Sequence, residues 1–212
     1  MDIILFGIQG SGKGTQGKVL ADKYGLKFFE MGGELRQIID SKSPLGKKIK
    51  SIVASGNLVD DDTIMEVVGN FISNIPPEQP ILFDGIPRTL KQSEKLLNLL
   101  AKNNRDAFAV LIKISENEAI KRLTQRRICK SCKGVYPPSY KLDKCQICGG
   151  DLTIRNDDNM ESIKTRLSTY EKETVPVINS FYERDHLIEV DGEQDIENVS
   201  KEMIEKVDYL FS

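Results

Sequence analysis

The sequence predicts an α/β fold in which a doubly wound parallel sheet is flanked by helices. Two observations predict it. Short apolar runs bounded by polar or turn residues alternate along the chain with longer stretches of helical spacing. A glycine-rich turn also joins the first apolar run directly to the first helical stretch. Alternation of strand and helix gives parallel strands joined by crossovers, so helices cover both faces of the sheet.

Four strands and six helices are expected from this alternation. The apolar runs, which we interpret as strands buried on both faces, are residues 3–6, 81–83, 108–112 and 187–190. Helical spacing predicts helices over residues 15–24, closed by a glycine, and over residues 61–72, 89–101, 116–126 and 196–210. A longer helix is predicted over residues 160–182, interrupted or kinked around Pro176. Two segments do not fit the alternation: residues 31–59 are short helical pieces without a strand, and residues 127–158 are rich in cysteine, proline and lysine.

The composition excludes several classes of function. The 212 residues are enough for one core with small inserted subdomains, and 39% of them are hydrophobic. A net charge of −2 gives no basis for a role on nucleic acids or membrane surfaces, and no apolar run is long enough to cross a bilayer. The N-terminus is typical of a buried strand and not of a signal peptide. We therefore expect a cytoplasmic protein without nucleic-acid or membrane partners.

The glycine-rich turn has the pattern of a phosphate-binding loop. It runs from Gly7 to Thr15, with Gly7, Gly12 and Lys13 in the spacing G-x-x-x-x-G-K between a strand and a helix. Its backbone N–H groups and the helix N-terminus would bind a polyphosphate, and the ammonium group would reach the outer phosphates. The alternative is a chance glycine-rich turn. Because Gly14 follows the lysine and the hydroxyl comes later, at Thr15, the ending favours small-molecule kinases over GTPases.

Four cysteines form two C-x-x-C pairs: Cys129 with Cys132, and Cys145 with Cys148. Four thiolates at this spacing match a structural Zn²⁺ site with every position occupied by protein, so the metal would fold the segment and do no chemistry. Disulfides, free thiols, an iron–sulfur cluster or another metal are the alternatives. A reducing compartment favours metal ligation over disulfides.

Charged residues at a strand end suggest where the chemistry occurs. Asp84 follows the apolar run at 81–83, at the carboxyl end of a strand, where ligands bind in open α/β sheets, and a carboxylate there would hold the water shell of Mg²⁺. A turn or capping aspartate is the alternative. Arg88 lies close by. Phosphoryl transfer needs cations around the migrating group, and further arginines stand at Arg36, Arg122, Arg126, Arg127, Arg155 and Arg166. Any one of these alone could instead form a solvated salt bridge.

Taken together, these motifs resemble the adenylate kinases. The residues that carry the resemblance, which spans essentially the whole chain, are Gly7 to Thr15, Leu35-Arg36, Gly56 to Val59, Asp84 to Thr89 with Gln92, Arg126-Arg127, Arg155 with Asp157-Asp158, and Arg166. The chain looks like the long-lid form with a four-cysteine zinc site. The resemblance implies reversible, Mg²⁺-dependent transfer of the terminal phosphoryl group of ATP to AMP, giving two ADP, by a monomeric enzyme.

The resemblance also implies a role for each matching position. On the ATP side it implies contacts from Gly10, Ser11, Gly12, Lys13, Gly14, Thr15, Arg122, Arg126, Val135, Tyr136 and Gln194. On the AMP side it implies contacts from Met31, Arg36, Asn57, Leu58, Val59, Gly85, Ile86, Pro87, Arg88 and Gln92, the last reading the adenine edge. Arg155 and Arg166 would bridge donor and acceptor phosphates. Catalysis would rest on Lys13, Asp84, Arg88, Arg126, Arg155 and Arg166.

The same resemblance implies three parts that move relative to one another. A core formed by residues 1–30, 60–121 and 159–212 would carry an AMP-binding segment, residues 31–59, and a lid with a zinc knot, residues 122–158. Both would close over the nucleotides, assemble the arginines and expel water.

Some positions depart from the family pattern. Met31-Gly32-Gly33 stands where the family has Thr-Gly-Asp, so either Met31 simply packs or the contact with the acceptor base has changed. Ile86 replaces a usual phenylalanine. Kinases of UMP and CMP are therefore the neighbouring alternative, although Gln92 and the long lid favour AMP. A zinc-ribbon module that binds nucleic acid is the alternative of another class. We interpret His186 as a surface or edge residue and not as a general base.

Overall fold

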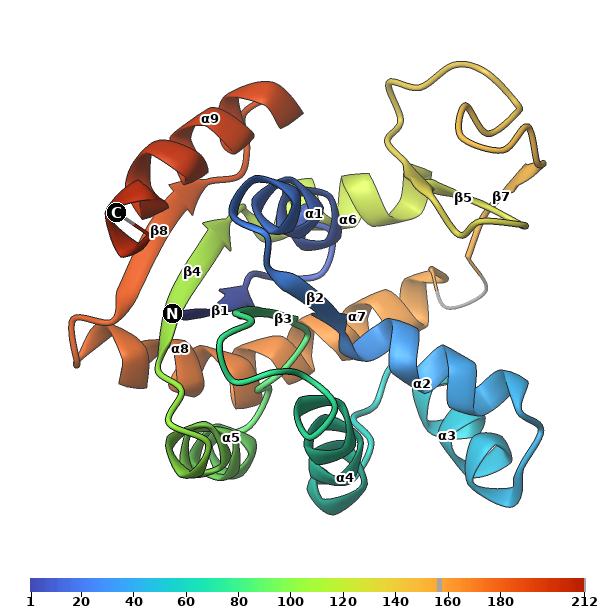
Figure 1. Ribbon diagram of the computed structural model, residues 1–212. Coiled ribbons are helices and arrows are strands. Elements are labelled where there is room, and N and C mark those ends of the chain that lie inside the picture. Colours follow the sequence, from blue (N-terminus) through green and yellow to red (C-terminus); the bar gives the residue numbers. More distant parts are fainter. Residues whose placement is uncertain (156–157, 212) are drawn as a thin grey trace.

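The structure, a computed structural model, describes residues 1–155 and 158–211. Its centre is a parallel sheet of five strands in the order β2-β3-β1-β4-β8 (Figure 1). The strands are β1 (Asp2–Phe6), β2 (Lys27–Glu30), β3 (Ile81–Asp84), β4 (Ala107–Lys113) and β8 (Leu187–Asp191). Every neighbouring pair is parallel. The predicted fold class, a doubly wound parallel sheet with flanking helices, is confirmed.

Helices cover both faces of this sheet, as Figure 1 shows. They are α1 (Lys13–Tyr24), α4 (Asp61–Ile72), α5 (Leu90–Lys102), α8 (Val175–Tyr182) and α9 (Ile196–Val207), whereas α6 (Glu116–Gln125) and α7 (Met160–Thr169) pack with each other in a separate apolar cluster. Alternate residues of β1 point to opposite faces. Ile4 and Phe6 pack with α4, α5 and α8, whereas Ile3 and Leu5 pack with α1 and α9. The two apolar clusters thus sandwich the sheet.

The strand register brings carboxylates to one edge. In the pairing of β2 with β3, Glu30 is opposite Asp84, and in the pairing of β1 with β3, Leu5 is opposite Asp84. The carboxyl ends of three strands therefore meet just before the glycine loop that follows Phe6. This edge is where a ligand is expected in an open α/β sheet.

The sequence prediction needed correction at two strands. Strand β2 was not predicted, because its four residues, Lys-Phe-Phe-Glu, offer only two apolar side chains at the sheet edge. Strand β8 is not buried on both faces: it is the other edge strand, and only Val190 is fully covered. The predicted interruption of the long helix is confirmed: a π-helical turn at Tyr170–Thr174 directly precedes α8, which has Pro176 in its first turn.

The two segments that did not fit the strand–helix alternation lie outside the central sheet. Residues 31–59 contain α2 (Met31–Asp40) and α3 (Pro44–Ala54), which pack on each other. Residues 127–158 contain a small antiparallel sheet of β5 (Arg127–Cys129), β6 (Val135–Tyr136) and β7 (Leu152–Thr153), in the order β6-β5-β7. Figure 1 shows this sheet standing apart from the central one. Within the described residues, no helix has the length and apolar character that crossing a membrane requires.

Candidate active site

The glycine loop after β1 is held against helix α6. Gly10 and Gly12 have φ values of 90° and 96°, which glycine adopts without strain. A side chain at Gly10 would come within 3.1 Å of the carbonyl oxygen of Ala119, so the loop can lie this close only with glycine there. At Gly12, by contrast, a Cβ would meet no atom within 4 Å. The loop is thus fixed on one side and open on the other.

The loop also contains polar atoms that the protein leaves unsatisfied. Gly12 begins helix α1 without a side-chain cap. Among the described residues, the buried Ser11 Oγ and Gln9 Oε1 have no hydrogen-bond partner. Buried polar groups are otherwise almost always paired, because leaving one unpaired costs about 1–3 kcal/mol. A hydroxyl donor without a partner at a helix N-terminus fits a bound anion.

Lys13 turns its ammonium group back onto the loop. Its Nζ donates hydrogen bonds to the carbonyl oxygens of Gly7 and Ile8. Burial lowers the pKa of Lys13 to about 8; the charge of Asp84 opposes the shift, and the positive charges of Arg88 and Arg126 add to it. The ammonium group is therefore a cation at a position where burial makes positive charge costly. A bound polyanion would offset this cost, so the position fits a polyphosphate site.

Asp84 is the buried carboxylate at the centre of these charges. Burial raises its pKa, opposed chiefly by Lys13 and further by Arg88 and Arg36, while the charge of Glu30 adds to the rise. A Cβ at Gly14 would lie 3.7 Å from Asp84 Oδ2. The position after the loop lysine, where the general motif has a hydroxyl, therefore faces this carboxylate, and Asp84 stands where it was predicted.

Arg88 is held by its own main chain and side chain. Its Nε donates to the carbonyl oxygen of Gly85 at 2.9 Å, and its backbone N–H donates to Gln92 Oε1 at 2.7 Å. The carbonyl oxygen of Arg88 accepts a hydrogen bond from Thr174, the last residue of the π-turn. Burial lowers the pKa of Arg88, and the charges of Arg166 and Arg155 add to that effect.

Gln92 is fully engaged in this structure. While Oε1 accepts from Arg88, its Nε2 donates to Asp61 Oδ1 at 2.9 Å, and the residue is 2% exposed. Reading an adenine edge would require an exchange of these hydrogen bonds, so that role stays a prediction.

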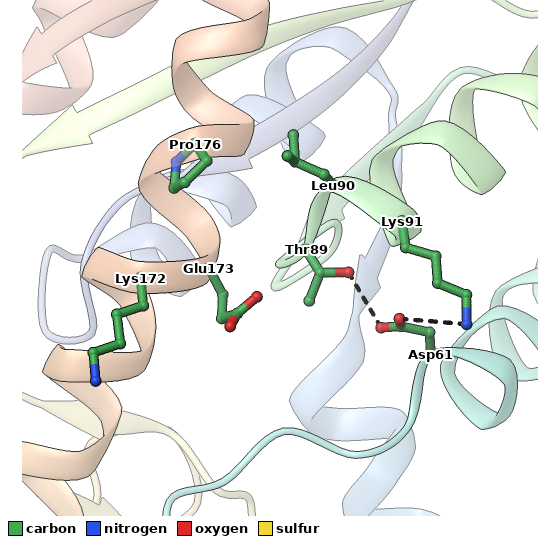
Figure 2. A pocket seen from close by; sticks show the side chains of 7 residues that line it. All are labelled: Asp61, Thr89, Leu90, Lys91, Lys172, Glu173 and Pro176. Carbon is green, nitrogen blue, oxygen red and sulfur yellow. Dashed lines mark hydrogen bonds and ion pairs between the residues drawn. The ribbon is translucent and has the colours of Figure 1, made fainter.

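Asp61 also lines a surface hollow of about 280 Å³, which Figure 2 shows between the start of α5 and the π-turn. There the Thr89 hydroxyl points at the Asp61 carboxylate, which also faces Lys91 (Figure 2). The lining residues are Asp61, Thr89, Leu90, Lys91, Lys172, Glu173 and Pro176, and none is a predicted nucleotide contact.

The start of α2 contributes further predicted contacts. Arg36 forms an ion pair with Glu30, with 2.6 Å between Nη2 and Oε1. Met31 is 2% exposed and belongs to the main apolar cluster, so it packs, and a contact with a base stays a prediction. Ile86 and Val59 are buried in the same cluster, whereas Asn57 is exposed.

Asp158 links two of the predicted phosphate-binding arginines. Its carboxylate is completely buried and accepts two hydrogen bonds from Arg126, at 2.6 and 2.8 Å, and one from Arg166 at 2.9 Å. Sequence reasoning gave this aspartate no role, although it belongs to the motif that carried the resemblance. Its neighbour Asp157 lies outside the described residues.

Of the remaining predicted ATP contacts, Arg122 and Gln194 are engaged in other interactions. Arg122 pairs with Glu118 and donates to the carbonyl oxygen of Gly192. Arg127, which was not a predicted ATP contact, pairs with Asp143 beside the small sheet. Gln194 donates to Glu202 and to the Asp191 carbonyl oxygen. Val135 is 53% exposed and Tyr136 only 4% exposed. His186 is exposed and stacks on Phe108, in agreement with the surface interpretation.

The four cysteines converge on one point. All are free thiols, and their sulfur atoms lie within 4.8 Å of one another, with Cys132 and Cys145 separated by 3.4 Å and Cys129 and Cys148 by 3.5 Å. Tetrahedral Zn²⁺ with Zn–S bonds of 2.3 Å sets sulfur atoms about 3.8 Å apart, so the cluster fits zinc binding.

The groups around Cys145 favour its thiolate, whereas the pKa of Cys132 is raised to about 12: the backbone N–H of Gly134 opposes the rise, and hydrogen bonding with Cys145 causes it. Burial alone would raise the pKa of Cys145, but the Tyr136 hydroxyl and the backbone N–H groups of Cys148 and Ile147 lower it to about 6. A Cβ at Gly150 would lie 3.0 Å from Cys129 Sγ, so glycine at this position lets the backbone pass close to the sulfur.

Comparison with known proteins identifies the family. The family model for adenylate kinase matches residues 5–186. The chain is 37% identical over 208 residues to an adenylate kinase of Archaeoglobus fulgidus, covering 96% of both chains. It is likewise 37% identical over 215 residues to an adenylate kinase of Staphylococcus aureus, covering 99% of this chain and all of the relative. An adenylate kinase of Thermosipho melanesiensis is 36% identical over 210 residues, covering 96% and 98%.

The match spans the glycine loop, Asp84, Arg88, the arginine pair on Asp158 and the four-cysteine cluster. The chain belongs to the adenylate kinase family, and it is a nucleoside monophosphate kinase that transfers the terminal phosphoryl group of ATP reversibly to AMP.

Proposed function

We propose that the donor ATP, with Mg²⁺, binds along the glycine loop. Gly10 to Thr15 supply backbone N–H groups, and Lys13 moves its ammonium group from the carbonyl oxygens of Gly7 and Ile8 to the outer phosphates. Asp84 holds the water shell of the magnesium ion that accompanies ATP. The observation that carries this proposal is the set of cations around the buried Asp84: the charges of Lys13, Arg88 and Arg36 all lower its pKa.

The acceptor AMP is proposed to bind between β3 and residues 31–59, which we call the AMP segment. Arg36 and Arg88 bind its phosphate, while Gly85, Ile86, Pro87 and residues 57–59 line its pocket. Gln92 reads the adenine edge after releasing Asp61 or Arg88. Met31 would shape this pocket from within the core rather than by a polar contact.

Transfer is proposed to proceed in line and directly between the two nucleotides. Phosphoryl transfer needs positioning and charge stabilisation more than covalent help. Arg155 and Arg166, whose charges already act on Arg88, bridge the two phosphates, and Arg126 and Arg122 neutralise the donor. Asp158 keeps Arg126 and Arg166 side by side, so one buried carboxylate orients two of the catalytic cations.

Closure of two segments over a stationary core would complete the site. The AMP segment moves over the acceptor, and residues 122–158, which we call the lid, move over ATP, with Val135, Tyr136 and Gln194 bordering its base and ribose. Residues 1–30, 60–121 and 159–212 form the core. Closure excludes water and suppresses hydrolysis of ATP when no acceptor is present.

We further propose that the metal in the lid is zinc and that the enzyme is a cytoplasmic monomer. Cys129, Cys132, Cys145 and Cys148 would hold the ion and leave no open position, so it would keep the lid rigid and take no part in transfer. Free thiols that must ligate a metal persist best in a reducing compartment.

An acceptor panel tests the proposed specificity. Purified enzyme with Mg·ATP is assayed against AMP, CMP, UMP and GMP, following formation of the nucleoside diphosphates. AMP should be the best acceptor by at least tenfold in kcat/KM, because a base-reading amide discriminates by hydrogen bonds left unpaired with the wrong base. A higher kcat/KM with CMP or UMP would show that the substitution at Met31 changes the acceptor specificity and that Gln92 does not select adenine.

A further inference from the structure

The start of helix α2 differs from the family pattern in a way that the proposed function does not use. Met31-Gly32-Gly33 replaces Thr-Gly-Asp, so no polar side chain extends from positions 31 to 33. Met31 is buried in the core. The helix nevertheless starts beside Asp84 and carries Arg36 one turn later.

The carboxylate of Glu30 occupies the space that the two glycines leave. A Cβ at Gly33 would lie 3.4 Å from Glu30 Oε2 and 3.7 Å from Glu30 Cδ, and one at Gly32 would lie 3.5 Å from Glu30 Oε1. A Cβ at either position would thus be in van der Waals contact with this carboxylate, so a carboxylate on residue 33 would lie next to that of Glu30.

Glu30 uses this position to hold Arg36. It is the residue that precedes α2, but its side chain does not cap the helix. Instead Oε1 accepts a hydrogen bond from Arg36 Nη2 at 2.6 Å, the short distance expected of a charge-assisted bond. A Cβ at Gly32 would lie 3.0 Å from Arg36 Nη1, so the guanidinium also lies over the glycine backbone.

The Glu30–Arg36 pair lies on the side of the site where the acceptor phosphate is proposed to bind. Glu30 is opposite Asp84 in the strand register, and its charge raises the pKa of Asp84 while that of Arg36 lowers it. A negative charge at this place repels an anionic acceptor. It can favour binding only by fixing the guanidinium, whose remaining N–H groups stay available to a phosphate.

We propose that Glu30 is a positioning residue for Arg36, that its carboxylate replaces one missing at residue 33, and that it thereby strengthens binding of the AMP phosphate. This inference rests on the proposed function, in which Arg36 binds that phosphate.

Steady-state kinetics of Glu30→Gln test it, because the variant keeps the side-chain size and removes the charge. KM for AMP should rise about three- to fivefold, since a charge-assisted hydrogen bond between two partly exposed side chains is weakened, while kcat and KM for ATP change less than about twofold. Glu34→Gln is the matched control: it removes the same charge from the same helix turn, where Glu34 has no hydrogen bond or ion pair within the described residues, and its KM should not change.

Moving the carboxylate back gives a second readout. Glu30→Gln combined with Gly33→Asp should recover most of the lost affinity for AMP, which a purely structural role for Glu30 would not predict. An unchanged or lower KM in Glu30→Gln, or no recovery in a double variant that melts at the parental temperature, would overturn the inference.

The variant Arg36→Ala distinguishes failure of this inference from failure of the proposal that Arg36 binds the AMP phosphate. It should raise KM for AMP at least as much as Glu30→Gln does. If Arg36→Ala raises KM and Glu30→Gln does not, only the positioning role is wrong. If Arg36→Ala leaves KM unchanged, the proposed phosphate contact fails, and the role of Glu30 fails with it.

Discussion

The AMP segment and the lid leave the same sheet but are stabilised by different means. Buried side chains of the AMP segment, among them Leu35, Ile49 and Val59, belong to the cluster that also contains Phe29 and Phe83 of the central sheet. The lid instead has a small cluster of its own, made of Cys129, Tyr136 and Cys145, with Tyr140 and Leu152 at its margin. One segment shares the core of the protein, and the other depends on its cysteines.

This difference follows from size. A lid of fewer than forty residues cannot bury enough apolar surface to order itself, and domains this small usually need a metal or disulfides (below about 40 residues). The AMP segment needs neither, because Met31 and Ile49, both at most 2% exposed, extend the main core into it. We therefore expect the two segments to respond differently to loss of metal and to core mutations.

The largest expected effect comes from removing a metal ligand. Cys145→Ser should abolish metal binding and unfold the lid, because structural zinc supplies about 10–16 kcal/mol in small zinc domains. Metal content should fall from one zinc per chain to none, and kcat should fall at least tenfold. Gln146→Ser, an exposed neighbour in the same C-x-x-C pair, is the control and should keep both. Full activity in metal-free Cys145→Ser would contradict this view of the lid.

A smaller effect is expected from truncating a core residue of the AMP segment. Ile49 is completely buried, so Ile49→Ala should lower the free energy of global unfolding by about 2–5 kcal/mol. Leu152→Ala, in the lid, should leave the midpoint of global unfolding nearly unchanged. Urea denaturation followed by circular dichroism measures both. Equal losses in the two variants would show that the segments share one cooperative core.

The smallest expected effect is a difference between the pH dependences of ATP binding and AMP binding. In the free protein, burial lowers the pKa of Lys13 to about 8, whereas the acceptor side relies on arginines, which stay protonated. If the pKa of Lys13 is lower in the free protein than in the ATP complex, the deprotonated fraction of Lys13 must take up a proton when ATP binds. Above pH 8, affinity for ATP should therefore fall, by up to about tenfold per pH unit, and affinity for AMP should not.

Isothermal titration calorimetry at pH 7 to 9.5, in buffers of different ionisation enthalpy, measures this proton uptake directly. Uptake that rises above pH 8 with ATP but not with AMP supports the assignment. Parallel pH profiles for the two nucleotides would show that Lys13 does not titrate in this range.

Much of this architecture could be predicted from the sequence because it depends on short, local sequence patterns. The buried strands β1, β3 and β4, the glycine loop and the paired cysteines are short contiguous signals. What could not be predicted depends on contacts across the fold. Strand β2 has only two apolar residues, and its pairing with β3 fixes Glu30 beside Asp84. The role of Asp158 appears only when Arg126 and Arg166, forty residues apart in sequence, reach the same carboxylate.

The π-helical form of the interruption at Tyr170–Thr174 is a third feature that was not predicted from the sequence. Pro176 predicted a break in the long helix, and the helix is irregular directly before it, because proline cannot donate a backbone hydrogen bond to the preceding turn. The irregular turn lies before it and ends at Thr174, which donates to the carbonyl oxygen of Arg88. Such turns often occur at functional sites, and only the tertiary contact reveals why this one is there.

Hydrogen exchange with and without a zinc chelator tests most directly whether the lid alone depends on the metal. The enzyme is incubated with a chelator until its metal is removed, and exchange of peptides from residues 127–155 is compared with that of residues 31–59. Protection should collapse in the lid peptides and persist in the AMP segment, at temperatures where the central sheet stays folded. Equal loss of protection in both segments, or unchanged protection in the metal-free lid, would contradict the account.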